Sequence, residues 1–555
     1  MSLLEQTPDM LSLKNVLERI EGLTEIFECS ESVLYKKNYY DQVVNFVYNS
    51  MHFEIAIPKS FPYRLPYITL LDKIVHSHID ERGVVCLPSV DEIVYDVSDQ
   101  ESIIKLSITA LKKLFLMDEQ ENQKEILYEY NDYLGIYSNR NYEITPFLFE
   151  DLEKGYICIH EKLCFIGSNE LLEDYKEKNK IATLTNYSYL RLDLCSLPKV
   201  KYDSISSEDI ISCLTDDSLS SLKKYRNNSI KQFYLLRYKN PDFIYNYILI
   251  TVENDKPNLK ANGLLSNLKL KITPVQNRTF SFLRERGGSK VFESKVLVIG
   301  CGSVGSEICE LLASSGFVKI DIVDADDLKF ENGYRNSSGF YYLYLDKLYS
   351  KVLTCKAYIE TKFPDTNITI FERNVVDLIE SGKLNLNEYK YIVSCTGNSI
   401  VDNYLNNYLY KNNIKTYLVF SWLEPYGIAE HILSIDTEKK GCFECLLKSS
   451  YNIQLCSNEN EYYKKRNNVC SGSFTPYGRI STVRLASNTV EIIVNNELDY
   501  ERILNRHIIH KGNVKPFLNM GFKKTKFMDY TDEKLNEHSR DYIREGCNTC
   551  GKLDY

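Results

Sequence analysis

The chain has 555 residues, of which 44% are hydrophobic and 26% are charged, and its formal net charge at pH 7 is -9. These values predict a soluble globular protein of several domains and exclude a general electrostatic attraction to nucleic acid. No run of about 18 apolar residues occurs, so we expect no membrane span, and the acidic N-terminus lacks the basic and apolar regions of a signal peptide. The 16 cysteines without a secretion signal favour a cytoplasmic location.

The first 145 residues carry the pattern of a small α+β domain. Residues 8–28 place leucine, isoleucine and valine at helical spacing, which predicts an amphipathic helix. The apolar or alternating runs 43–47 and 51–57 predict strands, and a third strand follows the proline-rich stretch that ends at Pro66. We expect a second helix over about 101–116.

A histidine turn and a cysteine lie between these strands and the second helix. His76-Ser-His78 is followed by Gly83-Val-Val-Cys86-Leu87. From the residues alone, Cys86 is better explained as a buried strand residue, because free cysteine is among the most buried residue types. The whole layout, over about residues 10–130, resembles that of ubiquitin-conjugating enzymes. The resemblance implies that Cys86 forms a thioester and that His76 is structural. It also implies that His78 replaces the asparagine that usually supports the oxyanion, and a histidine can also donate a hydrogen bond there.

The region from 146 to 274 is the least informative part of the chain. Short apolar runs predict strands near 147–149, 157–165, 233–236 and 247–251. It shows neither a repeat nor the spacing of metal ligands or catalytic residues. We therefore expect a linker domain of unknown α+β fold that positions the two ends of the chain.

The strongest motif begins at Lys295, where an apolar β-branched run predicts a buried parallel strand. A glycine turn and a helical pattern follow, and then a second strand over 319–323 that ends at Asp324. The turn contains Gly300, Gly302 and Gly305. Glycines let the backbone approach a phosphate, the helix N-terminus offers free N–H groups, and an acid about 20 residues on accepts a ribose hydroxyl. This context predicts a Rossmann-like nucleotide-binding domain.

The residues after Asp324 favour ATP over NAD. Asp326, Asn332, Arg335 and Lys351 follow in order. A dehydrogenase gains little from such groups, whereas an adenylating enzyme must hold a triphosphate and offset charge as pyrophosphate leaves. This order resembles ubiquitin-activating enzymes and their bacterial ThiF-type relatives.

The ThiF resemblance implies specific roles in binding ATP and Mg²⁺. Asp324 would hold the ribose, Asn332, Arg335 and Lys351 would hold the phosphates, and Asp326 matches the second acid of the family's pattern. The sequence departs from the family's pattern in two ways. Extra residues separate Arg335 from Lys351, so Lys347 is the runner-up for the phosphate-binding lysine, and Asn336 stands where the family usually has glutamine. The resemblance also implies a homodimer in which an arginine, for which Arg278 is the candidate, reaches the partner's ATP site. Gly397 stands where the family commonly has an aspartate, and Asp402 is the nearest substitute.

Two CxxC pairs lie about 100 residues apart, Cys442 with Cys445 and Cys547 with Cys550. Two such pairs suit a tetrahedral, structural Zn²⁺ held by four thiolates, and the alternative is two independent thiol pairs. Between them, Cys470 precedes a predicted helix, whose N-terminus and Arg479 would favour its thiolate. The resemblance implies that Cys470 is the catalytic cysteine of a crossover segment, with Cys456 as the runner-up.

Together these patterns predict three domains: a ubiquitin-conjugating-like α+β domain (1–145), a linker domain (146–274) and a Rossmann-like ThiF adenylation domain with the crossover cysteine and zinc site (275–555). This order resembles the fused conjugation enzymes of CBASS anti-phage operons. The resemblance implies that the enzyme adenylates a protein C-terminus, forms a thioester on Cys470, and transfers the acyl group to Cys86 and then to a lysine amine.

The CBASS resemblance also implies that the donor is a cGAS-like nucleotidyltransferase. Three alternatives remain at this stage. The first is a ThiF-like enzyme that activates a ubiquitin-like or sulfur-carrier protein and has no need of Cys86. The second is an NAD(P) oxidoreductase, and the third is a non-catalytic scaffold.

Overall fold

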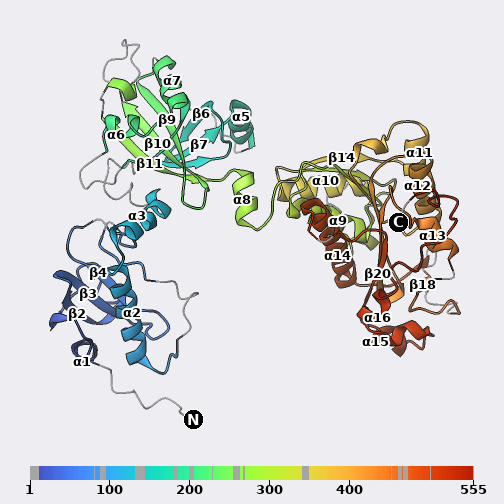
Figure 1. The fold of residues 1–555 in the computed structure, drawn as a ribbon, viewed down its shortest axis with the longest axis horizontal. Helices are drawn as coiled ribbons and strands as arrows, with labels where there is room; N and C mark the ends of the chain where they lie inside the picture. The colour runs from blue at the N-terminus through green and yellow to red at the C-terminus, as the bar shows by residue number, and fades with distance from the viewer. Residues whose placement is uncertain are drawn as a thin grey trace. The chain divides into compact units, whose positions relative to one another are not determined.

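The computed structural model divides the chain into two compact units, Met1–Thr279 and Phe280–Tyr555, which are described separately (Figure 1). The structure describes residues 12–74, 76–80, 82–87, 95–131, 144–178, 185–198, 205–227, 229–253, 263–266, 269–340, 349–449, 451, 453–459, 465–466, 473–500 and 502–553.

The N-terminal part of the first unit is a four-stranded antiparallel meander, in the order β1-β2-β3-β4, whose core also includes residues of α1 and α2. The elements are α1 (Leu13–Glu18), β1 (Thr24–Glu28), β2 (Tyr40–Tyr48), β3 (Met51–Pro58), β4 (Tyr67–Leu70) and α2 (Gln100–Leu114). The predicted helix over 8–28 is wrong at its C-terminal end. The helix ends at Glu18, Gly22 takes a left-handed φ of 84°, and Ile26 belongs to β1. Residues 8–11 of the predicted helix lie outside the described residues.

Helix α3 (Glu119–Tyr128), which the sequence did not predict, joins this domain to the next. Asp118 caps it, and Asp118 and Glu121 form a capping box. Ile126 and the following Tyr130 are buried in the core of the next domain.

The middle domain is a closed barrel of seven strands in the order β10-β11-β5-β7-β6-β8-β9. Its strands are β5 (Thr145–Leu148), β6 (Lys154–His160), β7 (Leu163–Gly167), β8 (Thr185–Asp193), β9 (Lys231–Lys239), β10 (Tyr245–Glu253) and β11 (Leu270–Asn277), and its helices are α5 (Asn169–Lys178), α6 (Ser207–Ile211), α7 (Asp216–Lys224) and η1 (Gly263–Ser266). Successive residues of β9 and β10 alternate between two separate cores. Both faces of these strands are buried, which explains their continuous apolar runs.

The second unit is built on a seven-stranded sheet in the order β14-β13-β12-β15-β16-β17-β20. Its strand pairs are parallel except for β16–β17 and β17–β20, so β17 alone runs in the opposite direction. Its strands are β12 (Val296–Ile299), β13 (Lys319–Val323), β14 (Asn367–Phe371), β15 (Tyr391–Ser394), β16 (Tyr417–Leu423), β17 (Ala429–Asp436) and β20 (Arg506–Lys511), with a small hairpin of β18 (Lys465–Arg466) and β19 (Ser473–Phe474). The doubly wound order confirms the predicted Rossmann-like class. It places a switch point between β12 and β15, where ligands bind in such sheets.

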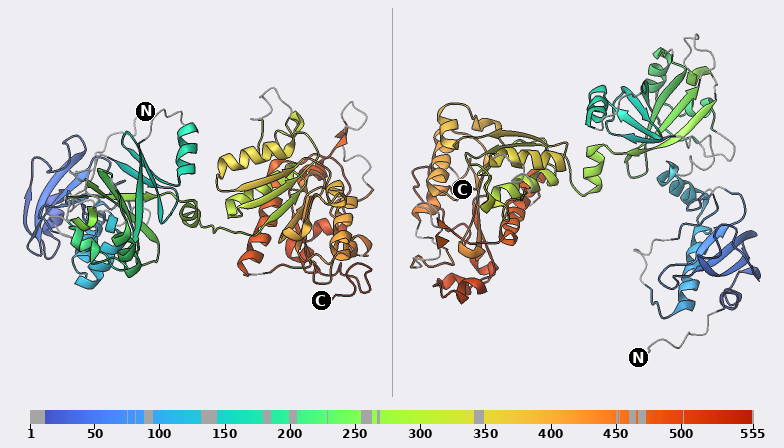
Figure 2. Two further views of the ribbon diagram at one scale, coloured as in Figure 1. Left: turned by 90° about the horizontal axis from the view of Figure 1, so that it is seen from above. Right: turned by 180° about the vertical axis from the view of Figure 1, so that it is seen from behind.

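Helices cover both faces of this sheet (Figure 2). One core contains residues of α9 (Ser303–Ser315), α10 (Lys351–Lys362) and α14 (Arg479–Leu498). The other contains residues of α11 (Val375–Glu380), α12 (Ser399–Lys411) and α13 (Phe443–Lys448). The remaining helices are α8 (Phe280–Arg286), α15 (Lys515–Asn519), α16 (Asp532–Asn536), η2 (Phe330–Asn332), η4 (Leu386–Glu388), η5 (Pro425–Gly427) and η6 (Lys526–Asp529).

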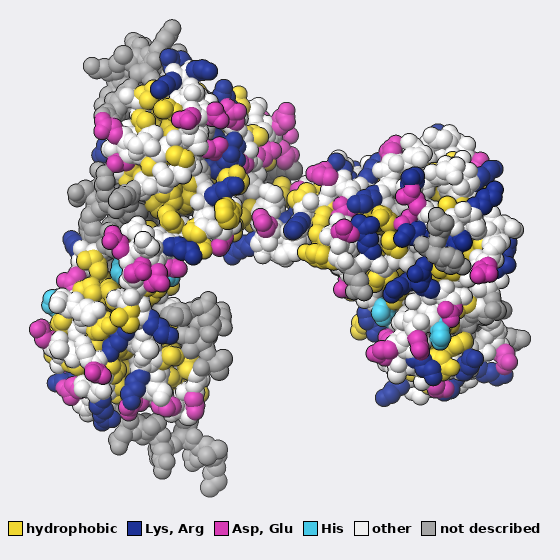
Figure 3. Space-filling view, viewed as in Figure 1, with side chains coloured by type: hydrophobic (Ala, Val, Ile, Leu, Met, Phe, Trp, Pro, Cys, Tyr) yellow, Lys and Arg dark blue, Asp and Glu magenta, His cyan; other side chains and the backbone are white. Residues whose placement is uncertain are grey.

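Acidic and basic side chains are interspersed over the described surface (Figure 3), as the modest net charge predicts. Among the described helices, none combines the length and the apolar character needed to cross a membrane.

Candidate functional site

The glycine turn after β12 is compressed to a degree that requires glycine. Gly300 has φ 92°, and a Cβ on Gly305 would lie 1.8 Å from the carbonyl oxygen of Gly300. Helix α9 begins at Ser303, and its N-cap Gly302 provides no side-chain hydrogen bond to the first turn. The N–H groups of that turn are therefore available to an anion.

Asp324 and Lys351 form a polar group beside this turn. Asp324 accepts hydrogen bonds from the N–H of Cys301 (2.7 Å) and of Asp326 (2.9 Å). Lys351 Nζ lies 2.6 Å from Asp326 Oδ2 and 3.8 Å from Asp324 Oδ1. The structure thus brings together both acids and the lysine that the sequence singled out, whereas the runner-up Lys347 lies outside the described residues.

Asn332 and Arg335 lie on the other side of the turn and line a cavity of about 800 Å³. Asn332 Oδ1 accepts the N–H of Lys329 at 2.9 Å, and the guanidinium of Arg335 lies 4.9 Å from the ring centroid of Tyr477. Asn336 is buried, with its Nδ2 3.5 Å from the carbonyl oxygen of Cys301, so it packs under the glycine turn.

Asp402 lines the same cavity from the first turn of α12. Its Oδ1 accepts hydrogen bonds from the hydroxyls of Ser394 (2.6 Å) and Thr396 (3.0 Å), and burial raises the pKa of this carboxyl. Gly397 has φ 62°, and a Cβ there would meet no atom within 4 Å. The carboxyl that faces the cavity therefore comes from α12.

A buried polar group that sequence reasoning missed lies beside the cavity, which His431 and His507 help to line. His431 Nε2 donates to Glu424 Oε1 (2.9 Å), and His431 Nδ1 is 3.0 Å from His507 Nε2. The ring of Trp422 stacks on both imidazoles, with centroids 5.0 Å and 5.4 Å away. These residues are far apart in sequence, and only the β16, β17 and β20 register brings them together.

The crossover segment starts at this polar group. The N–H of Cys456 donates to Glu424 Oε2 at 2.7 Å, and the Cys456 side chain is buried in an apolar cluster. The predicted catalytic Cys470 lies outside the described residues. Arg479, at the start of α14, binds Glu307 of α9, with Nε 2.7 Å from Oε1. Its guanidinium is thus engaged with a carboxylate of the helix that follows the glycine turn.

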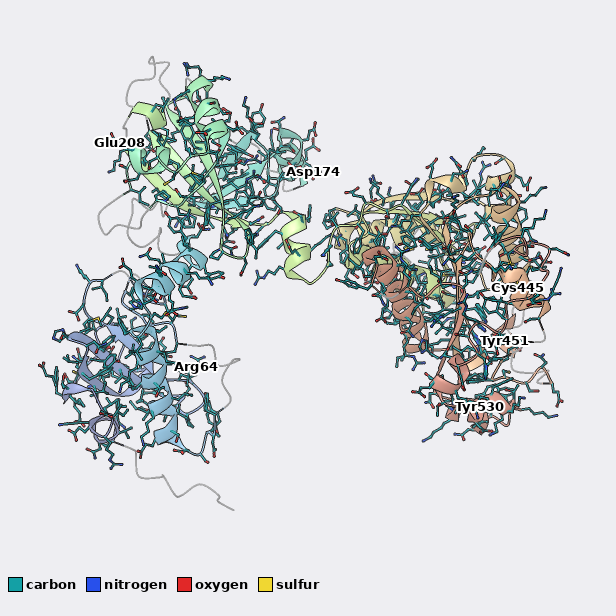
Figure 4. All side chains as sticks on the ribbon, viewed as in Figure 1. Arg64, Asp174, Glu208, Cys445, Tyr451 and Tyr530 are labelled. Atoms are coloured by element: carbon teal, nitrogen blue, oxygen red, sulfur yellow. The ribbon has the colours of Figure 1, made fainter. Side chains whose placement is uncertain are left out.

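The four cysteines of the two CxxC pairs meet at one buried point, on α13 and the C-terminal tail. Figure 4 labels Cys445 there and Tyr451 in the segment that follows α13. The Sγ–Sγ distances are 3.9 Å for Cys442–Cys445, 3.8 Å for Cys442–Cys547 and 3.5 Å for Cys445–Cys550, and all four sulfurs lie within 4.8 Å of one another. Zn–S bonds of about 2.3 Å at tetrahedral angles require sulfurs roughly 3.8 Å apart. The cluster therefore fits a four-thiolate zinc site.

Cys86 is exposed in the first unit, and its N–H donates to the carbonyl oxygen of His78 at 2.7 Å. His78 has φ 59°, and α3 and its C-terminal cap hold its ring, with Nδ1 3.3 Å from Glu129 and Nε2 3.6 Å from Glu125. The hydrogen bond to Glu129 raises the pKa of His78. By contrast, burial lowers the pKa of His76, whose ring packs on Phe115.

Arg278 follows β11 in the first unit, with its guanidinium 3.9 Å from the ring centroid of Phe147 and Nη2 3.3 Å from Gln276 Oε1. Its side chain is exposed. Arg284 is instead buried in the second unit, where it makes a paired salt bridge to Asp365. Of these two arginines, Arg278 is the one whose side chain is accessible to another molecule.

Comparison with known proteins identifies two families in the chain. Residues 275–521 match the ThiF family, and residues 28–141 match prokaryotic E2 family B. The chain is therefore a fusion of an E2-like, ubiquitin-conjugating-type domain with a ThiF-type, ubiquitin-activating-like domain.

Several curated relatives match parts of the chain. Ubiquitin-like modifier-activating enzyme 5 of Caenorhabditis briggsae is 22% identical over 264 residues, which are 44% of this chain and 58% of that protein. The ATP-dependent ubiquitin transferase-like protein Cap2 of Enterobacter hormaechei is 31% identical over 136 residues, 24% of this chain and 22% of Cap2. Escherichia coli MccB has 17% identity and a TM-score of 0.34, with 47% of this chain and 66% of MccB covered. The chain spans about half the length of the curated relatives that it matches first.

Proposed function

We propose that this protein is an ATP-dependent protein-conjugating enzyme. The C-terminal carboxylate of a donor protein attacks the α-phosphorus of ATP, giving an acyl adenylate and pyrophosphate. The Cys470 thiolate then displaces AMP to form a thioester, the acyl group passes to the Cys86 thiol, and a lysine amine takes it to form an amide. Each transfer exchanges one acyl bond for another, which divides a difficult reaction into activated stages.

The arrangement around the glycine turn is the observation that carries this proposal. The N-terminus of α9 and Arg335 can hold phosphates, and Asp324 lies where a ribose acid is needed. Mg²⁺ would neutralise charge on the leaving pyrophosphate, with Asp402 as the nearest cavity carboxyl. The four-cysteine cluster would hold Zn²⁺ as a closed structural site that ties the C-terminal tail to the sheet.

An exposed thiol in a separate E2-like domain distinguishes conjugation from simple activation. Activation of a ubiquitin-like or sulfur-carrier protein would need the second unit but not Cys86. The presence of both family domains in one chain therefore favours a relay that ends on a target amine. We further propose, from the Cap2 likeness, a cytoplasmic role in anti-phage defence, a cGAS-like nucleotidyltransferase as donor, and a homodimer in which Arg278 reaches the partner's ATP site.

Intact-mass analysis and non-reducing gels with ATP, Mg²⁺ and a candidate donor test the relay. We expect a thiol-sensitive adduct in the wild type, loss of all adducts in Cys470→Ala, and an adduct that persists on Cys470 in Cys86→Ala. Cys195→Ala is the matched control, since Cys195 is also an exposed free cysteine of the first unit. If ATP–pyrophosphate exchange and adducts are both absent with every donor, the proposal is wrong.

A further inference from the structure

The lining of the cavity beside the glycine turn has two chemically different parts, which we call its two ends. The first end is formed by the α9 N-terminus at Gly302 and by the polar or charged side chains of Asn332, Arg335 and Asp402. The second end is mainly apolar or aromatic, with Trp422, Phe443, Leu446, Leu447, Tyr451 and Ile453 beside polar residues such as His431 and His507. A triphosphate is suited to the first end only. The second end needs an occupant that is apolar and yet continuous with the reacting groups.

Among the described residues, the second end offers no carboxylate, lysine or arginine side chain to the cavity. Burial lowers the pKa of His507 well below its usual range, so the imidazole is neutral. The Glu424 carboxylate is 6% exposed, accepts the N–H groups of Leu455 and Cys456, and does not line the cavity. An ionised side chain would therefore lose its hydration on entry without gaining an ion pair to a described carboxylate, lysine or arginine of this end.

Trp422 is held as a fixed surface at this end. Its ring plane lies within 5° of His431 and 16° of His507, and the hydrogen bonds between Glu424, His431 and His507 fix both imidazoles. A preorganised aromatic ring binds an apolar side chain with little loss of rotational freedom. Leu447 of α13 also lines the cavity, and because it is 49% exposed it can contact an occupant directly.

We propose that Trp422 and Leu447 form a specificity site for a bulky apolar side chain near the C-terminus of the donor protein. This inference rests on the proposed function, because it assigns the occupant of the cavity as the donor's C-terminal segment. The terminal carboxylate lies at the Arg335 end, where charge complementarity favours it, and the apolar side chain lies against Trp422. Glu424, His431 and His507 act through Trp422 as positioning residues.

Synthetic hexapeptides with a free C-terminal carboxylate test the assignment. ATP–pyrophosphate exchange is measured for peptides that carry phenylalanine, leucine, glycine or glutamate at each of the last three positions. We expect one position at which phenylalanine or leucine lowers the peptide KM about tenfold relative to glycine, as burial of a large apolar side chain predicts. This preference should vanish in Leu447→Ala, so that the KM values for the apolar and glycine peptides become equal. Leu518→Ala is the control, since Leu518 is 40% exposed and lies outside the cavity lining.

Trp422 supplies a readout that does not depend on turnover, because it is the only tryptophan in the chain. Binding of the preferred peptide should change its fluorescence and protect it from acrylamide quenching, and glutamate at the same position should abolish both effects. Equal KM values for all peptides, or a preference unchanged in Leu447→Ala, would overturn the inference while leaving adenylation intact. Fluorescence binding without any exchange would refute the proposed function but support the apolar site. Absence of both signals would overturn both.

Discussion

The ion pair between Arg479 and Glu307 joins α14 to α9, the helix that follows the glycine turn, and its removal should destabilise the second unit. Glu307 is 4% exposed, and its side chain accepts both Nε and Nη2 of Arg479. Loss of a partner from a fully buried pair costs about 3–5 kcal/mol, whereas exposed pairs contribute roughly 0–1 kcal/mol. The Arg479 side chain is 47% exposed, so we expect Arg479→Met to lower the free energy of unfolding by about 2 kcal/mol near neutral pH.

The pH dependence of this loss follows from the carboxyl that remains. Burial already raises the pKa of Glu307, and Arg479 lowers it. Without Arg479 the folded-state pKa rises further above the unfolded value, so the folded variant binds the extra proton more strongly. Its stability deficit should therefore be full above the folded pKa and shrink toward zero as pH falls to the unfolded value of about 4.3.

Urea unfolding followed by Trp422 fluorescence measures this effect in the intact chain, because the only tryptophan reports on the second unit. Glu307→Gln in the Arg479→Met background is the control, since a neutral amide removes the titrating group and should flatten the pH dependence. A deficit below about 0.5 kcal/mol near neutral pH, or one equal at both ends of the pH range, would refute the reasoning.

Three further predictions concern the other sites. Lys351→Ala should raise the KM for ATP at least about tenfold in pyrophosphate exchange, because the variant lacks the cation that faces the carboxylates of Asp324 and Asp326 and that would bind the phosphates. Lys383→Ala, which removes an exposed lysine, should leave this KM unchanged. Glu129→Gln should lower the NMR titration midpoint of His78. A His78 pKa that is raised in the folded state stabilises the fold below about pH 6.5, and this stabilisation is lost as pH rises through the folded-state pKa of His78. Glu129→Gln should therefore be less stable than the wild type in mild acid only. Elemental analysis should find zinc in the wild type and none in Cys442→Ser, and this variant should unfold at a lower temperature.

The Rossmann-like half was predictable because its signals are local. Strand, glycine turn, helix and Asp324 follow one another within 30 residues, and each has a residue requirement that backbone geometry imposes. The two CxxC pairs were equally predictable, since each pair spans only four residues of sequence and forms half of the cluster.

Other features depend on pairing between distant segments. Glu424, His431 and His507 span more than 80 residues, and only the antiparallel addition of β17 and β20 to the sheet brings them together. The barrel was not predicted because its strands are buried on both faces and show little alternation. Helix α3 was missed because its apolar stripe contains few residues, one of which, Ile126, packs into another domain.

The closed middle barrel restricts how the protein can recruit another chain. Each of its seven described strands already has a hydrogen-bonded neighbour on both sides. An extended peptide therefore finds no free strand edge there with which to pair. In the described parts of the four-stranded sheet and of the open seven-stranded sheet, such pairing is confined to the outermost strands β1 and β14. Residues 83–85 already pair with the outer edge of β4, and residues 532–539 already accept the outward N–H groups of β20. A partner that binds the barrel must therefore recognise side chains and loops. Because no strand of the partner has to pair in register with the barrel, the partner's sequence can diverge without that constraint.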